Sequence, residues 1–483
     1  MRRAAATAVA LVLLGAPATR AAEGKPPRSF PVRIVKIGGE PSSPAVRAHL
    51  EFCAAEGFNA VWVPAPLAGR WSARAAPRGP TLDPAFVDLA RFCRQKKLRV
   101  FVSVNPPGDT GGAFVFSSRD DEKRLRSFLR ILRRECGIRD FVLSFDDQPL
   151  ELEDVRDVAV YGQNAAPAHL DLARRVLARS GRDTTVWLCG GVYSDWHLED
   201  DDYQPYAREF LRALPGIPFR IGIVWTGPDT ISSSITREDL AAARRTLGGR
   251  ELLLYDNYPV NDDADHEVLA LVLGPLRKRD PRIPEVSGTY LACPMLELGA
   301  SRMPLLTIAD FLRDPDGYDP ETSWQRAIRR LAGDDPLVQD ALKTQALEWG
   351  GFVGTLNYHH WETANPRALA QELGNPALMA TWSYTLKRYP ERMMALASVA
   401  DTAFRDDVVA AMARRLAVAR ALPLILELRA PRSAAPARAQ EILREIERER
   451  EVVAANPNVR IALDRFLDAA SILELLEPGG IHD

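Results

Sequence analysis

The chain has 483 residues, of which 46% are hydrophobic and 26% charged, which is typical of a globular protein with a large core. Its formal net charge is −2 at pH 7, with acidic and basic residues interspersed. No broad field of one sign is present to hold a nucleic acid or an anionic membrane, so the expected partner is a neutral small molecule or a glycan.

The N-terminal segment 1–22 is predicted to be a secretory signal peptide. Two arginines precede an apolar run at 4–16, and small residues follow as far as Ala22. This run is too short to span a bilayer, and no later segment reaches the roughly 18 apolar residues of a spanning helix. We expect cleavage near Ala21 or Ala22 and a secreted or periplasmic protein, with an uncleaved lipid-facing anchor as the alternative.

Eight short runs rich in β-branched residues recur along the first two thirds of the chain. They lie at 32–39, 59–65, 98–104, 140–147, 184–191, 219–227, 251–259 and 288–295. The segments between them carry apolar residues at helical spacing, and several end in glycine, as helix caps do. Eight such alternations over about 270 residues predict a (β/α)8 TIM barrel. An open doubly wound sheet is the alternative, but the first run lacks the glycine fingerprint of that fold.

Beyond the last run the strand signal stops. Amphipathic helical patterns occupy 318–333, 335–356, 375–400 and 404–430, and a small-residue loop or hinge is predicted at 431–439. We therefore expect a barrel domain over 30–312 and an α-helical C-terminal domain over 313–483.

The catalytic groups of such a barrel lie where its strands lead into loops at the C-terminal face. Unusual side chains are found there in several runs: Asp146, Asp147, Tyr193, Thr226, Asn257, Asp262 and Cys293. Side chains that converge from several strands on one rim are what a sugar pocket requires.

The adjacent pair Asp146 and Asp147 in the sequence SFDDQ is the sharpest signal. Two neighbouring carboxylates repel, so one of them tends to keep a proton near neutral pH and can act as an acid. On a regular strand the two would face opposite sides, which favours a place at the strand end. A helix cap or a solvated loop is the bland alternative; the preceding apolar run favours a buried site.

Four stretches in matching order resemble glycoside hydrolase family 84, the β-N-acetylglucosaminidases that include the eukaryotic O-GlcNAcases. They are FVLSFDDQ, IVWTGPDTISSSITRE, LLYDNYPVNDD and the long segment that begins CPMLELGASRMP. The resemblance covers residues 30 to about 335. It implies a retaining hydrolysis in which the substrate's own 2-acetamido oxygen forms an oxazoline, so that the enzyme needs neither a nucleophile nor a cofactor.

The resemblance also implies roles for the central residues. Asp146 would orient and polarise the acetamido N–H, and Asp147 would protonate the leaving oxygen and later deprotonate water. Asp146 is then expected to stay charged while Asp147 keeps the proton. Tyr193 falls where the family has a tyrosine whose hydroxyl bonds the acetamido oxygen.

Further matches would form the walls of the sugar site. Cys189 and Thr226 fall among residues that line the pocket of the acetamido methyl group, and Tyr255 replaces a tryptophan as an aromatic wall. Asn257 matches an asparagine that supports the acetamido end. Asp262 matches the aspartate that binds the O4 and O6 hydroxyls.

Three positions depart from the family, all on the side of the pocket that grips O3 and O4. After the first strand, Gly38 or Gly39 would keep a backbone contact, but an aromatic pair is gone. A lysine aligns with Pro66, and an asparagine with Cys293, a far weaker hydrogen-bonding partner. Each lost buried contact would cost on the order of 1–3 kcal/mol. The expectation is a working reaction with altered or weakened sugar recognition.

The leading hypothesis is an exo-β-N-acetylglucosaminidase that acts on glycans or glycoconjugates. One alternative is a barrel that binds glycans without hydrolysis. Another is a hexosaminidase for a different 2-acetamido sugar, in β-GalNAc, peptidoglycan or hyaluronan fragments. No nucleic acid or membrane span is expected, and natural substrate and oligomeric state stay open.

Other chemistry-bearing residues are predicted to be structural. The five cysteines, at irregular spacings, read as small buried hydrophobes. The histidines show no metal-ligand spacing near a strand end, and the adjacent His359 and His360 read as packing or surface residues, so no metal is expected. Trp225 is expected to be structural, with sugar stacking as the alternative. Asp195 and Trp196 are expected in solvent, with contact to the leaving group as the alternative.

Overall fold

The computed structural model describes residues 28–178, 181, 183–261, 271–350 and 390–413, together with residues 441, 444, 445 and 448. The predicted signal peptide, the predicted hinge, and His359 and His360 lie outside the described residues, as does Asp262. These predictions, and the domain division at residue 312, stay predictions.

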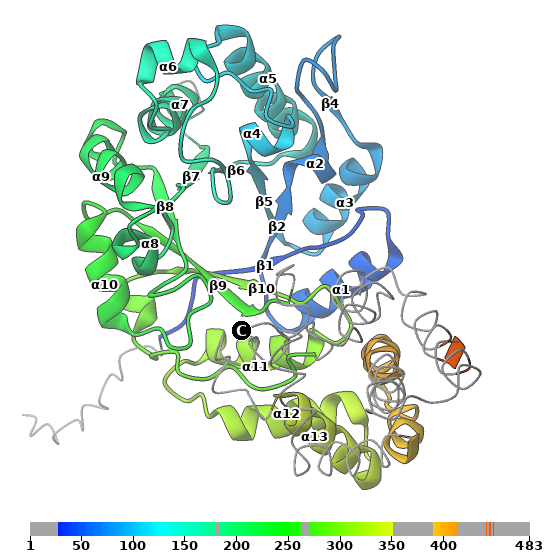
Figure 1. Ribbon diagram of the computed structural model, residues 1–483. Coiled ribbons are helices and arrows are strands. Elements are labelled where there is room, and N and C mark those ends of the chain that lie inside the picture. The colour runs from blue at the N-terminus through cyan, green and yellow to red at the C-terminus, as the bar shows by residue number, and fades with distance from the viewer. Residues whose placement is uncertain are drawn as a thin grey trace, which may run out of the picture.

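Eight parallel strands close into a barrel, with helices arranged around its outside (Figure 1). Around the barrel the strands pair in the order β1 (Val32–Lys36), β10 (Thr289–Cys293), β9 (Leu252–Pro259), β8 (Gly222–Trp225), β7 (Thr185–Cys189), β6 (Asp140–Ser144), β5 (Arg99–Val104) and β2 (Ala60–Pro64), and β2 pairs with β1. Each strand lies inside one of the eight predicted runs. The predicted (β/α)8 barrel is therefore confirmed.

The longer helices between the barrel strands also occupy the predicted segments. They are α1 (Pro44–Ala55), α3 (Pro84–Gln95), α5 (Arg119–Cys136), α7 (Ala166–Ala178), α9 (Gln204–Ala213) and α10 (Arg237–Thr246). A further helix, α11 (Arg302–Arg313), follows β10, outside the helical segments predicted from the sequence. In α5 the local causes are clear: the Ser118 hydroxyl accepts from the Asp121 N–H at the start, and Gly137 ends the helix in the left-handed conformation.

Short elements lie in the loops between strands and helices. They are α2 (Ala65–Ala68), β3 (Gly69–Arg70) and β4 (Thr81–Leu82), which form a hairpin, α4 (Pro106–Asp109), α6 (Val155–Tyr161), α8 (Asp195–Glu199), η1 (Leu214–Gly216) and η2 (Ile283–Glu285). The hairpin was not predicted, because strands of two residues carry no periodicity to detect.

The core has two layers because side chains alternate along each strand. One set packs outward against the helices. The other fills the barrel interior with residues such as Ile34, Phe101, Val142, Trp187 and Leu291. For Ile34, Val142, Trp187 and Leu291, the residue two positions further along the strand lines the cavity at the mouth of the barrel.

The C-terminal region is helical as far as the structure describes it. α12 (Pro320–Ala332) packs on α11, and α13 (Pro336–Gly350) packs on α12; residues 390–396 and 402–413 are also helical. An ion pair of 2.6 Å between Arg302 and Asp401 joins the last of these segments to α11. None of the helices in the described ranges is long and apolar enough to cross a membrane.

Candidate active site

A cavity of about 460 Å³ opens at the carboxyl ends of the barrel strands. This volume falls within the roughly 300–1,000 Å³ typical of small-molecule sites. The predicted residues that line it are Asp146, Asp147, Cys189, Tyr193, Thr226, Tyr255, Asn257 and Cys293. The structure thus brings eight predicted side chains from β6, β7, β8, β9 and β10, and the loops that follow, to one place.

The aspartate pair begins the loop after β6 rather than closing the strand. β6 ends at Ser144, and Asp146 and Asp147 form the turn that follows. Asp147 has a φ of 55°, in the left-handed region that non-glycine residues rarely adopt and that aspartate tolerates better than most. This turn explains how two neighbours in sequence both line the cavity.

The two carboxylates have different surroundings. Asp146 is half-buried and accepts a 2.5 Å hydrogen bond from the Ser144 hydroxyl, whereas Asp147 is exposed. Burial raises the pKa of Asp146, and the Ser144 hydrogen bond lowers it. The charge of Asp147 then raises this pKa and that of Lys36 lowers it, and the net direction is upward. In the free protein the raised pKa therefore belongs to Asp146, whereas the expectation from the sequence was that Asp146 stays charged and Asp147 keeps the proton.

Tyr193 links the loop after β7 to the aspartate pair. Its hydroxyl donates to Asp147 Oδ1 at 3.1 Å. Burial and the charge of Asp147 raise the pKa of Tyr193, so the phenol stays protonated near neutral pH and available as a donor.

Thr226 and Asn257 hold the loop that lines one wall of the cavity. The Thr226 hydroxyl donates to the Asp229 carbonyl at 2.7 Å, and Asn257 Nδ2 donates to the Thr230 carbonyl at 2.8 Å. Thr230 and Ile231 of this loop line the cavity. Both predicted residues therefore shape the wall as well as lining it.

A buried ion pair also holds the loop that contains Thr230 and Ile231. Asp256, between two site residues of β9, accepts bonds of 2.7 and 2.8 Å from Arg279 and one of 2.5 Å from Tyr290. Arg279 also donates to the Ser232 carbonyl at 3.0 Å. Asp256 and Arg279 are 1% and 5% exposed, and breaking such a buried pair destabilises strongly. The ion pair thus fixes the loop 226–235 against β9.

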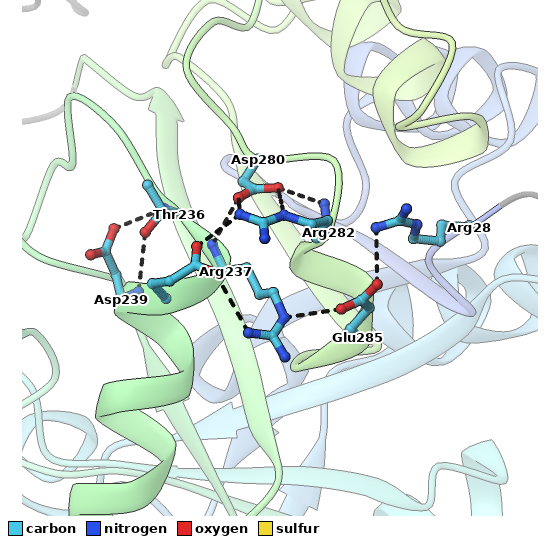
Figure 2. Close-up of polar contacts among 8 residues, drawn as sticks. Arg28, Thr236, Arg237, Asp239, Asp280, Arg282 and Glu285 are labelled. Carbon is cyan, nitrogen blue, oxygen red and sulfur yellow. Dashed lines mark hydrogen bonds and ion pairs between the residues drawn. The ribbon is translucent and has the colours of Figure 1, made fainter.

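The far end of this loop is held by the network in Figure 2. Thr236 caps α10 in a capping box with Asp239, and the Arg237 N–H donates to Asp280. The Arg237 side chain bonds Glu285 at 2.9 Å. Arg28 bonds the same carboxylate at 2.9 Å and Arg282 bonds Asp280, which ties the N-terminal end of the described chain to this region.

The opposite wall of the cavity comes from β10, β1 and β2. Tyr255 reaches toward it from β9: its hydroxyl donates to the Cys293 sulfur at 3.5 Å, and its ring meets Trp62 edge-on at 5.7 Å between centroids. Lys36 Nζ lies 5.8 Å from the centre of the same ring, a cation–π distance. This wall is apolar with one cation among the described residues that line the cavity.

The remaining predicted positions are not brought into the lining. Gly38 and Gly39 are exposed in the loop after β1, and Pro66 is exposed on α2. They are not among the residues that border the cavity. A role for either glycine in sugar binding therefore stays a prediction.

Sequence reasoning missed Lys36, Trp62 and Ser144, which line the cavity. Each lies two residues beyond an inward-facing residue of its strand, so the period-two alternation could have identified them. Arg279 carried no such signal, because its partner lies 23 residues away in the sequence.

Other predictions have mixed outcomes. All five cysteines are buried, as predicted. Trp225 is fully buried and donates to Asp195 at 3.2 Å, so its structural role is confirmed, whereas Asp195 is half-buried rather than in solvent. Within the described residues, no group of three or more His, Cys, Asp or Glu side chains could hold a metal ion.

Comparisons with known proteins identify the family and the fold of the chain. A family model described as beta-N-acetylglucosaminidase matches residues 82–346. A solved structure of a mutant O-GlcNAc hydrolase from Thermobaculum terrenum superposes with a TM-score of 0.62 at 21% identity, covering 93% of this chain and 95% of that one. The structure of CpGH84B superposes with a TM-score of 0.58 at 17% identity, covering 93% and 74%. At these identities the two structural likenesses concern the fold.

Proposed function

The chain belongs to the β-N-acetylglucosaminidase family of glycoside hydrolases, and we propose that it removes terminal β-linked N-acetylglucosamine from glycans or glycoconjugates by retaining, substrate-assisted hydrolysis. The observation that carries this proposal is the adjacent pair Asp146 and Asp147 facing one cavity, with Tyr193 bonded to the second carboxylate.

In the first step, the acetamido oxygen of the substrate attacks the anomeric carbon as the glycosidic bond breaks. Asp146 accepts the acetamido N–H and stabilises the positive charge that develops on the oxazoline ring. Asp147 gives its proton to the leaving oxygen. In the second step, the Asp147 carboxylate takes a proton from water, and that water opens the oxazoline from the opposite face, so the β-configuration is retained.

Burial raises the pKa of Asp146 in the free protein, and a bound substrate would act in the opposite direction. A carboxylate that accepts a hydrogen bond is stabilised in its charged form. The acetamido N–H would therefore favour the ionised form of Asp146. The ionised Asp146 carboxylate would then lie beside the positive charge that develops on the oxazoline ring.

Export is part of the proposal. The apolar N-terminal segment with its leading arginines supports a secreted or periplasmic protein. The expected substrates are then cell-wall, host-glycan or polysaccharide fragments rather than sugars on cytosolic proteins.

The first experiment measures hydrolysis of an aryl β-N-acetylglucosaminide by the purified protein and by Asp147→Asn. We expect turnover that falls by about 10²–10⁴-fold in the variant, the usual contribution of a general acid–base. A series of substrates with one, two and three fluorines on the acetamido methyl then tests the mechanism. Fluorine withdraws electrons from the attacking oxygen, so the rate should fall steeply along the series.

Absence of turnover in the folded wild-type protein would contradict the proposed activity. Turnover that is insensitive to fluorination would keep the activity and reject the oxazoline.

A second candidate function is hydrolysis of a different 2-acetamido sugar. It is favoured by the wall formed by Lys36, Trp62 and Cys293, which offers few neutral hydroxyl-binding groups. Aryl β-GalNAc and substrates with larger groups at O3 would separate the two candidates. Saturable sugar binding without hydrolysis of any of them would indicate a glycan-binding barrel.

A further inference from the structure

An aromatic cluster lies beside the aspartate pair but outside the cavity lining. It consists of His197 and Trp196 on α8 and Tyr203 just before α9, and it continues from Tyr193. The ring centroids of Tyr193 and His197 are 4.2 Å apart, those of His197 and Trp196 4.9 Å, and those of Trp196 and Tyr203 5.6 Å. The four rings form a continuous row that leads from the cavity to the surface.

The row begins at the carboxylate that would act as acid. Tyr193 donates to Asp147, and the charge of Asp147 contributes, after burial, to raising the pKa of Tyr203. A general acid must lie against the glycosidic oxygen that it protonates. The group attached to that oxygen therefore leaves on the Asp147 side, where the row lies.

The outer end of the row is exposed although it is large and apolar. Trp196 is 43% exposed and Tyr203 is half-buried, whereas His197 beneath them is 2% exposed. Burial lowers the pKa of His197 to about 4, so its ring is neutral at pH 7 and the row carries no charge. An uncharged aromatic surface that stays open to solvent suits a neutral ligand with a flat apolar face.

The row is held rigidly. The Asp195 and Trp196 N–H groups donate to the carbonyls of Gly227 and Pro228 at 3.0 and 2.9 Å. Trp225 donates to the Asp195 side chain, and the Ser194 hydroxyl lies 2.6 Å from His197 Nδ1. A surface fixed in this way loses little conformational entropy when it binds a ligand.

We propose that Trp196 and Tyr203 form a subsite for the sugar ring on the leaving-group side of the scissile bond, so that the preferred substrate is a β-linked oligosaccharide ending in N-acetylglucosamine. The ligand class follows from the surface, because a pyranose ring presents a face of C–H groups that stacks on an indole. An extended peptide or a charged group does not require a flat aromatic surface of this kind. This inference rests on the proposed function and adds the chemistry of the leaving group to it.

The test compares two ligands that share the cavity but differ at the leaving group. The disaccharide of β1,4-linked N-acetylglucosamine fills both positions, and the thiazoline analogue of the oxazoline has no leaving group. We expect Trp196→Ala to lower kcat/KM for the disaccharide by on the order of tenfold, while Ki of the thiazoline stays unchanged. Trp196→Phe should retain most of the activity on the disaccharide.

Phe219→Ala is the matched control. Phe219 is an aromatic side chain 66% exposed, but it precedes β8 and so lies at the opposite end of the barrel. It should change neither quantity.

Either of two results with Trp196→Ala would overturn the subsite. One is disaccharide hydrolysis at the wild-type rate, and the other is an equal loss of disaccharide turnover and thiazoline affinity, which would mean that the loop had lost its structure. A wild-type protein that cleaves the aryl glycoside but not the disaccharide would overturn it as well. A wild-type protein that cleaves neither would instead refute the proposed function.

Discussion

The two sides of one cavity differ in how they are built. The side formed by β6, β7, β8 and β9 carries carboxylates, a phenol and an amide, which are held by hydrogen bonds and by the ion pair of Asp256 and Arg279. The side formed by β10, β1 and β2 carries a thiol, an indole and one ammonium group. The first side has what bond cleavage needs, and the second has few groups for neutral hydroxyls.

This difference follows from the distance around the barrel. β10 lies four strands from β6 and β1 lies three strands from it. A sugar whose anomeric carbon and acetamido group meet the aspartate pair must therefore turn its far carbons toward β10 and β1. The groups that cleave the bond and the groups that contact the far carbons of the sugar lie on different strands. Each set can therefore change without the other.

The largest expected effect is on the first side. Asp146→Asn removes the charge that stabilises the oxazolinium while keeping the shape of the side chain, and kcat should fall by about 10²–10³-fold. The loss should be similar for good and poor leaving groups, measured with a series of aryl glycosides of graded phenol acidity. A loss that vanishes for the best leaving groups would assign the acid role to Asp146 instead.

Tyr193→Phe should have an intermediate effect. It removes the donor to Asp147 and the expected donor to the acetamido oxygen while leaving the ring contact with His197 in place. One lost hydrogen bond to a charged group corresponds to roughly 10-fold or more in kcat/KM. Steady-state kinetics on an aryl β-N-acetylglucosaminide measure it. A Tyr193→Phe variant with the wild-type rate would show that the Tyr193 hydroxyl takes no part in the reaction.

The role of the second side of the cavity can be tested by introducing a polar group there. Cys293→Asn places an amide where the thiol now accepts from Tyr255, and we expect kcat/KM for the neutral sugar to rise by roughly 5-fold. Cys293→Ala is the control, because it removes the sulfur without adding a donor. Equal rates in both variants would mean that this wall does not contact the sugar, and would break the contrast between the two sides.

The fold and the first side of the cavity can be predicted from the sequence better than the second side of the cavity. Eight apolar runs suffice for the barrel because the alternation of strand and helix is a local pattern. Asp146, Asp147 and Asn257 lie in motifs that are contiguous in sequence. Lys36 is an isolated charge at the end of a strand, and its place in the cavity can be inferred only once the inward face of β1 is known.

Two features of the site depend on three-dimensional surroundings alone. The left-handed turn at Asp147 is not encoded by a glycine, and the anchoring of the loop by Arg279 joins distant segments. The raised pKa of Asp146 is set first by how densely protein packs around it. Periodicity and motif spacing carry no information on that density.

The smallest expected effect is a change in pH dependence caused by Lys36 across the cavity. The charge of Lys36 favours ionised Asp146, and so partly opposes the rise that burial imposes on the pKa of this carboxyl. Lys36→Met removes that charge while Ser144, Asp147 and Cys189 still surround the carboxyl. The pKa of Asp146 should therefore rise further.

Because ionised Asp146 is the form that orients the acetamido group, the acidic limb of the kcat/KM profile should move to higher pH in Lys36→Met. Lys36→Arg keeps the charge and should leave the limb in place. An unchanged limb with a higher KM in Lys36→Met would show that Lys36 contacts the distal side of the sugar rather than tuning the carboxyl. The pH profile and KM of the Lys36 variants thus decide whether a charge on the second side of the cavity changes the pKa of a carboxyl on the first side.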